Sequence, residues 1–315
     1  MYSRDPEHDP RLGDLLVPLQ AAPADALTVV IIGVPQHIGV ERNGGRPGAA
    51  DAPSAIRQQL FTLATSAIVD VVRMGHLAIV DGGDIATEGK TLEQIHDQQE
   101  DVVYRHLAND RIPIVLGGGH DTAWPTLRAL DRRSAPYGVV NIDAHADVRP
   151  LLDGFRAHSG SPFYQMLTSA TSALAPGAFV EFGLQYHAVA KTHLEMLDQH
   201  DATVLMLDDV RRRGLTAAWD RAMGVLTSTG TSYISLDMDA FASAFAPGVS
   251  APAADGFAPH EIALCLRQAG RNATLKAFDV VEMNPAFDID NRTAKLSAIM
   301  IMEVLAGIAD RLRSR

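Results

Sequence analysis

Short apolar runs alternate along this chain with longer segments of helical periodicity. Seven runs rich in β-branched residues predict strands, at Leu27–Gly33, Ile112–Leu116, Gly138–Asp143, Phe179–Leu184, Thr203–Leu207, Tyr233–Asp237 and Leu275–Val281. These runs are apolar at nearly every position, whereas a half-exposed strand would alternate apolar and polar residues. Continuous apolar strands are typical of a parallel sheet that is covered by helices on both faces.

The segments between these runs have the spacing of amphipathic helices. They predict helices at Pro53–Leu63, Leu92–Ala108, Ala188–His200, Ala217–Ser228, His260–Ala269 and Thr293–Arg313. Pro53 suits the first turn of a helix, where its missing N–H is not needed. Thr91, with Gln94 three residues later, and Thr293 are expected to cap helix N-termini. The alternation of strands and helices predicts an α/β fold, a three-layer α-β-α sandwich with a mostly parallel sheet.

Composition and charge narrow the class of protein. No linker or repeat divides the 315 residues, so we expect an N-terminal extension at 1–26 and a single domain at 27–315. The net charge of −11 argues against nucleic acid and anionic membranes as partners. The only cysteine, Cys265, allows no disulfide within the chain. With no secretory signal and no apolar run of about 18 residues, the expected protein is soluble and cytoplasmic.

Polar residues of metal-ligand type follow two of the predicted strands. The strand Ile112–Leu116 is followed by Gly-Gly-Gly-His-Asp, in which His120 could be a ligand or part of a simple turn. The next predicted strand ends in Asp143, His145 and Asp147, which are two residues apart. In an extended backbone, residues with this spacing point to the same side. Three potential ligands would therefore converge.

A third cluster, Asp237 and Asp239, ends the strand Tyr233–Asp237. It could be an Asp-rich turn, but buried carboxylates without a partner are costly and favour a cation. Ligands bind at the carboxyl ends of strands in open α/β sheets, so the three clusters are expected to meet. Four carboxylates and two imidazoles exceed the needs of one structural zinc and favour two manganese ions. Such a pair can activate water to attack an electron-poor carbon.

These motifs resemble those of the ureohydrolase (arginase-like) family, which includes arginase, agmatinase, guanidinobutyrase and formimidoylglutamase. Four of them occur in the family order between Leu116 and Pro285: GGGHD, DAHAD, SLDMDAFASAFAPG and VVEMNP. The resemblance implies an arginase-like fold, two Mn²⁺ per subunit and a homo-oligomer, either a trimer or a hexamer. It also implies that one manganese binds His120, Asp143, Asp147 and Asp237 and that the other binds Asp143, His145, Asp237 and Asp239.

Within this family the chain is most similar to formimidoylglutamase, because of the triple glycine and the segment GVERNGGRPGA at 39–49. That similarity implies cleavage of the formimidoyl C–N bond of N-formimidoyl-L-glutamate, which yields glutamate and formamide in histidine degradation. Glu282 of VVEMNP would then face the substrate's cationic N–C–N group. Arg149 could hold a substrate carboxylate in a bidentate grip. Arg42 and Arg46 are candidates for the second carboxylate, or are structural ion pairs in a loop.

Other roles remain open from the sequence. Ser159 stands where arginase has its proposed proton-shuttle histidine, and we expect it to line the substrate site. The neighbouring His158 could be catalytic in its place or be a loop histidine. A guanidino-acid ureohydrolase that releases urea is the main alternative function. A catalytically silent ligand sensor and a single-zinc deacetylase-like enzyme are more distant alternatives.

Overall fold

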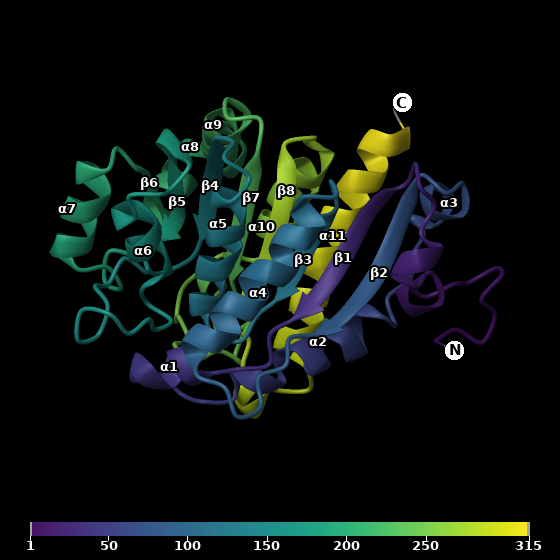
Figure 1. Ribbon diagram of the computed structural model, residues 1–315, viewed down its shortest axis with the longest axis horizontal. Helices are drawn as coiled ribbons and strands as arrows, with labels where there is room; N and C mark the ends of the chain where they lie inside the picture. Colours follow the sequence, from purple (N-terminus) through teal and green to yellow (C-terminus); the bar gives the residue numbers. More distant parts are fainter. Residues whose placement is uncertain (1, 314–315) are drawn as a thin grey trace.

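The computed structural model describes residues 2–313 and contains one eight-stranded sheet (Figure 1). The strand order is β2-β1-β3-β8-β7-β4-β5-β6, and every neighbouring pair runs parallel. The bounds are β1 Leu27–Gly33, β2 Leu77–Asp84, β3 Ile112–Leu116, β4 Tyr137–Ile142, β5 Leu174–Leu184, β6 Thr203–Met206, β7 Ser232–Asp237 and β8 Leu275–Val281. The seven predicted strands are confirmed. The prediction missed β2, an edge strand whose last four residues are exposed and polar or glycine.

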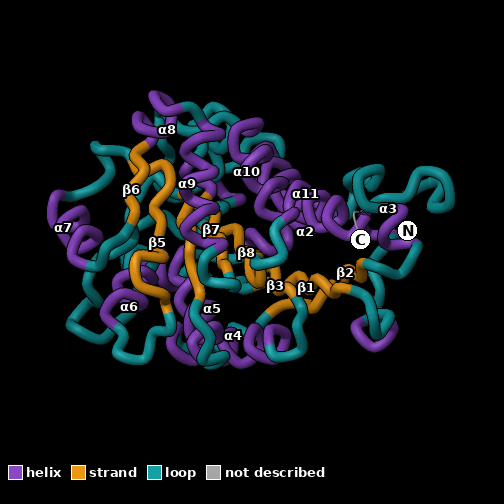
Figure 2. Tube along the Cα trace, turned by 90° about the horizontal axis from the view of Figure 1, so that it is seen from above, coloured by secondary structure: helices purple, strands orange, loops and turns teal. Residues whose placement is uncertain are grey.

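Helices cover both faces of the sheet, which confirms the three-layer sandwich. Figure 2 shows α4, α5 and α6 on one side and α2, α9, α10 and α11 on the other. A separate buried apolar cluster fills the space between the sheet and each helical layer. The helices are α1 Ile38–Arg42, α2 Ala52–Leu60, α3 Val69–Arg73, α4 Leu92–Leu107, α5 Ala123–Asp131, α6 Pro162–Thr168, α7 Lys191–Gln199, α8 Leu207–Arg213, α9 Leu215–Thr227, α10 Pro259–Arg271 and α11 Arg292–Arg313.

One of the two predicted helix caps is confirmed and the other is wrong. The Thr91 hydroxyl accepts the Gln94 N–H, and the Gln94 side chain accepts the Thr91 N–H in return. Thr293 lies inside α11, and its hydroxyl accepts the N–H of Gly248 instead. The carboxylate of Asp288 takes over the cap by accepting the Thr293 N–H at 2.9 Å and the Ala294 N–H at 3.1 Å. An upstream loop thus supplies the acceptor.

The segment before β1 packs against the sheet and its flanking loops. Leu12 is fully buried, and its N–H donates to the Leu63 carbonyl. Val17 donates in the same way to the carbonyl of Ile79 in β2. Among residues 2–313, no helix has the length and apolar character needed to cross a bilayer.

Candidate active site

The four motifs follow four strands that are neighbours in the middle of the sheet. His120 follows β3, Glu282 follows β8, Asp237 ends β7, and Asp143 follows β4. The order β3-β8-β7-β4 places these strands side by side (Figure 1). Because all of them run parallel, their carboxyl ends meet at one edge of the sheet. The sheet topology therefore brings together residues that lie up to 162 positions apart in the sequence.

The first group of candidate metal ligands, called the first ligand group, surrounds the imidazole of His120. Its Nδ1 atom lies 3.2 Å from Asp143 Oδ2, 3.0 Å from Asp147 Oδ2 and 3.1 Å from Asp237 Oδ2. His120, Asp143 and Asp237 are buried. Despite this proximity, His120 Nδ1 has no hydrogen-bond partner among the described residues. The nitrogen and the three carboxylate oxygens face one another as potential ligands to a common centre.

The second ligand group lies beside the first. His145 Nδ1 is 3.1 Å from Asp239 Oδ2 and 3.5 Å from Asp143 Oδ1. Asp143 thus offers one oxygen to each group and connects them. Asp237 lies in the first group, and its Oδ1 accepts the Asp239 N–H at 2.7 Å.

The ligands converge through local turns rather than through the extended backbone that we expected. β4 ends at Ile142, and Asp147 has a left-handed backbone with φ of 46°. Asp143 Oδ1 accepts the His145 N–H at 2.7 Å, which closes a turn of the kind that Asp side chains favour. Asp237 makes the same contact with Asp239. Both motifs therefore use one device, in which the first aspartate fixes the direction of the ligand two residues later.

A buried relay behind His120 fixes its ring. His120 Nε2 lies 2.9 Å from Ser235 Oγ, and Ser235 donates to Asp279 Oδ1 at 2.7 Å. Tyr233 donates to the other oxygen of Asp279. With the proton on Nε2, the lone pair of Nδ1 is free to bind a metal. This relay was not predicted from the sequence, although Ser235 and Asp279 are buried polar residues within mainly apolar strands.

The electrostatics of the site favour a divalent cation. Burial raises the pKa of Asp239 to about 6. Burial, together with the negative charges of Asp239 and Asp143, raises the pKa of Asp237 well above its usual range. Crowded carboxylates without a counter-charge are costly, and bound cations offset that cost. Mixed oxygen and imidazole donors suit manganese. The residues therefore fit a manganese site.

A cavity of about 280 Å³ opens next to the two ligand groups and is lined by several of the predicted catalytic and substrate-binding residues. Its lining includes Asn43, Arg46, Arg149, Ser159 and Glu282. Glu282 is buried, accepts the His120 N–H at 2.8 Å and has a left-handed backbone with φ of 61°. Burial raises the pKa of Glu282 to about 8. A cationic group beside it would favour its ionised form.

Comparison with known proteins gives the family. The sequence profile of the arginase family matches residues 27–307. The chain belongs to the arginase family. It is 32% identical to the formimidoylglutamase of Ralstonia nicotianae, over 95% of this chain and 89% of the relative. It is 34% identical to the formimidoylglutamase of Hahella chejuensis, over 89% and 85%.

Two solved structures share the fold of this chain. Trypanosoma cruzi formiminoglutamase with Mn²⁺ is 36% identical, with a TM-score of 0.87, over 96% of this chain and 99% of the other. Proclavaminate amidino hydrolase from Streptomyces clavuligerus is 27% identical, with a TM-score of 0.81, over 94% and 96%. The expected arginase-like fold is thereby confirmed.

Two predicted substrate residues of this arginase-family chain have their guanidinium groups engaged by protein. Arg42 Nη1 donates to Glu93 at 2.6 Å and to the Ala157 carbonyl at 3.0 Å, and Arg42 is not among the cavity-lining residues. Arg46 does line the cavity, but its Nε and Nη2 donate to the carbonyls of Ser250 and Val249. Its guanidinium also lies 3.8 Å from the centre of the Phe287 ring. Through these contacts, Arg42 and Arg46 hold neighbouring segments of the chain together and act as structural clamps.

His158 is buried beside the cavity lining rather than in it. Its Nε2 lies 3.0 Å from the Pro150 carbonyl, and its Nδ1 accepts the Gly160 N–H at 3.2 Å. Both ring nitrogens are therefore occupied by backbone groups of the loop that carries Arg149 and Ser159. This geometry gives His158 a role in closing that loop and offers no support for a proton shuttle.

Proposed function

We propose that this protein is a manganese-dependent hydrolase of linear amidines, and that its substrate is N-formimidoyl-L-glutamate. The products would be glutamate and formamide, in a step of histidine degradation. The observation that carries this proposal is that Arg149 and Glu282 line one cavity with both ligand groups. A cation for a carboxylate and an anion for an amidinium thus lie around a candidate hydrolytic centre.

The relatives support this substrate. Curated proteins that align with most of the chain are formimidoylglutamases, and the Trypanosoma cruzi enzyme of the same fold contains Mn²⁺. We infer that His120, Asp143, His145, Asp147, Asp237 and Asp239 hold two manganese ions per subunit. Bound manganese would supply a Lewis acid that activates water near neutral pH.

The protein's own residues would orient the substrate. Arg149 would hold a carboxylate through parallel N–H···O contacts. Glu282 would accept hydrogen bonds from the amidinium nitrogens and stabilise their positive charge as the carbon is attacked. The His120 N–H already donates to Glu282 Oε1 and fixes the carboxylate.

A guanidino acid is the second candidate substrate. The fold likeness to an amidino hydrolase favours it, because both substrate classes share the planar N–C–N group. Arg149 and Glu282 would contact a guanidino acid in the same way, and the metal ligands would be the same. Neither set of residues therefore distinguishes the two reactions.

The test measures both reactions on manganese-loaded protein. Glutamate release from N-formimidoyl-L-glutamate is followed by a coupled assay, and urea release is measured in parallel with arginine and 4-guanidinobutyrate. Preferential glutamate release is the expected result. Urea release without glutamate would overturn the substrate and retain the hydrolase. Metal binding with neither product would overturn the enzymatic proposal in favour of a ligand-binding relative.

A further inference from the structure

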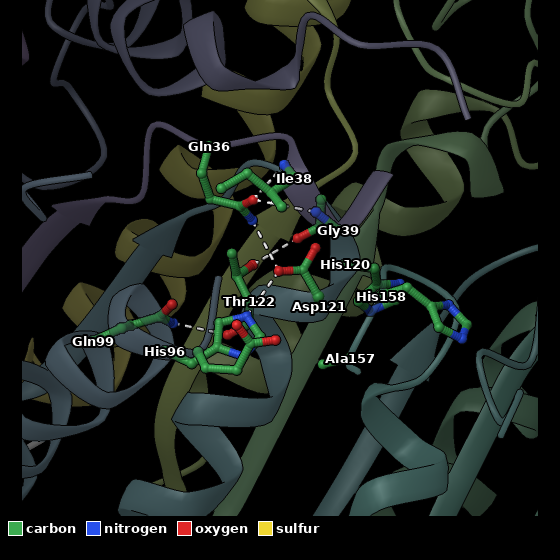
Figure 3. A network of polar contacts seen from close by, with 12 residues as sticks. Gln36, Ile38, Gly39, His96, Gln99, His120, Asp121, Thr122, Ala157 and His158 are labelled. Carbon is green, nitrogen blue, oxygen red and sulfur yellow. Dashed lines mark hydrogen bonds and ion pairs between the residues drawn. The ribbon is translucent and has the colours of Figure 1, made fainter. Parts of the chain in front are cut away.

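A buried polar network holds the start of α1, the helix that directly precedes the cavity-lining residue Asn43 (Figure 3). Asp121 Oδ2 lies 2.8 Å from His96 Nε2 and accepts from Gln36 Nε2 at 2.9 Å. The other end of the Gln36 amide accepts the Ile38 N–H at 2.8 Å. The side chains of His96, Asp121 and Gln36 are all buried. A satisfied buried network of this kind fixes the position of the segment it contacts.

The backbone of α1 is also fixed by close approach. A Cβ atom added to Gly39 would lie 1.9 Å from Asp121 Oδ1, so glycine is required for this contact. On the other side, the Gly39 carbonyl accepts the Ser159 N–H at 3.0 Å. α1 is therefore seated between Asp121, next to metal-ligand candidate His120, and the loop that carries Ser159.

Asn43, which immediately follows α1, connects two cavity-lining residues. Its Oδ1 accepts from Arg149 Nη1 at 3.0 Å, and its Nδ2 donates to Ser159 Oγ at 3.1 Å. Gly160 leaves room for this arrangement, because an added Cβ would lie 3.0 Å from Asn43 Nδ2 and 3.1 Å from Arg149 Cδ. Both hydrogen bonds are across long sequence separations, so they depend on the seating of α1.

We propose that Asn43 is a positioning and specificity-determining residue, which holds the Arg149 guanidinium at the cavity to receive a substrate carboxylate. Arg149 is an exposed side chain, and an unrestrained arginine loses rotamer entropy when a ligand fixes it. Asn43 accepts one of the five N–H donors of Arg149 and leaves the others for a carboxylate. This inference rests on the proposed function.

The amide of Asn43 matters as well as its position. A neutral acceptor orients Arg149 without neutralising it, whereas a carboxylate at position 43 would form an ion pair with the guanidinium. That ion pair would compete with the substrate for Arg149. Asn43→Asp should therefore bind substrate less tightly, although aspartate is similar in size and also accepts the Arg149 hydrogen bond.

The experiment compares Asn43→Ala and Asn43→Asp with the wild type, all loaded with manganese. Asn109→Ala is the matched control, because Asn109 is an exposed asparagine that follows α4 and lies outside the cavity lining. For N-formimidoyl-L-glutamate we expect each Asn43 variant to raise KM by about 10-fold, with kcat changed less than about twofold, since hydrogen bonds to charged groups have this size. Manganese content and melting temperature should stay at wild-type values.

Two further measurements separate positioning from general damage. In an Arg149→Met background, Asn43→Ala should have no additional effect on KM, because the two residues act as a unit. With the N-formimidoyl derivatives of 4-aminobutyrate and of 2-aminobutyrate, which each lack one carboxylate, the effect of Asn43→Ala should disappear for one of the two.

The outcomes distinguish this inference from the proposed function. Wild-type protein that releases no glutamate would overturn the substrate and this inference together. An active wild type whose Asn43→Ala variant keeps its KM would overturn the inference alone. An undiminished Asn43→Ala effect in the Arg149→Met background would also overturn it, as it would show that Asn43 acts by another route.

Discussion

Substitution of Ser235 tests the inference that His120 binds a metal and that a buried hydrogen bond orients its ring for this role. Its hydroxyl lies 2.9 Å from His120 Nε2 and donates to Asp279 Oδ1 at 2.7 Å. All three side chains are buried, so water cannot take the place of Ser235 without entering the core. In Ser235→Ala, His120 Nε2 loses its partner, and neither the tautomer nor the orientation of the ring is fixed.

The size of the effect follows from these two lost contacts. Removal of an outer partner of a metal-binding histidine typically lowers metal affinity about 10- to 100-fold. This range corresponds to about 1.4–2.7 kcal/mol. The hydrogen bond that the buried Asp279 carboxylate loses should separately lower the free energy of unfolding by about 1–3 kcal/mol. We therefore expect losses of both metal affinity and stability in Ser235→Ala.

Tyr233→Phe is the matched control, because it removes the other hydrogen bond to Asp279 and leaves the His120 contact in place. It should lower the free energy of unfolding without weakening manganese binding. Free Mn²⁺ can be followed by electron paramagnetic resonance in a titration of apoprotein, and stability by urea unfolding. Wild-type manganese affinity in Ser235→Ala, or an equal loss in both variants, would refute the relay as the device that orients His120.

Three further predictions concern the metal link, the pH dependence of stability and the cap of α11. Asp143→Asn should lose most manganese and most activity, because Asp143 belongs to both ligand groups, and full activity with stoichiometric metal would contradict this. Burial and the nearby Arg111 lower the pKa of His106 to about 4 from its ordinary 6.5. Folded protein then binds fewer protons than unfolded protein, so stability should fall as pH falls from 6.5 to 4, and urea unfolding of His106→Leu should show less of this loss. Asp288→Ala should lower the free energy of unfolding by about 1 kcal/mol, and a wild-type urea midpoint would show that the cap is dispensable.

The fold was predictable where the burial of an element is reflected in its pattern of apolar residues. Strands such as β1 and β3 are buried over almost their entire length, so their apolar runs match the observed bounds. β2 was missed because only its first half contributes to the core. The N-cap at Thr91 was predictable because both partners lie within four residues. The cap of α11 depends on the path of a loop, which no local pattern specifies.

The convergence of the candidate metal ligands was predictable for a similar reason. Asp143 and Asp237 each direct a ligand two residues later through a hydrogen bond to its backbone. The two-residue spacing therefore predicts that the side chains converge, even though the backbone is turned and not extended. Asp143 has a pKa lowered by His120 and His145 against the opposing effect of burial. Only the packed structure could show this balance.

The three arginines predicted to bind substrate show what could not be predicted from the sequence. Arg42 ends α1, whereas Arg46 and Arg149 stand in loops, and no local sequence pattern separates a structural arginine from a substrate-binding one. Their partners lie 51 positions away for Arg42, 204 for Arg46 and 106 for Arg149. A carboxylate neutralises Arg42, and backbone carbonyls occupy Arg46, whereas Arg149 meets a neutral amide that takes a single donor. How many guanidinium donors remain for a substrate anion thus depends on which distant group contacts each arginine, and that contact exists only in the folded chain.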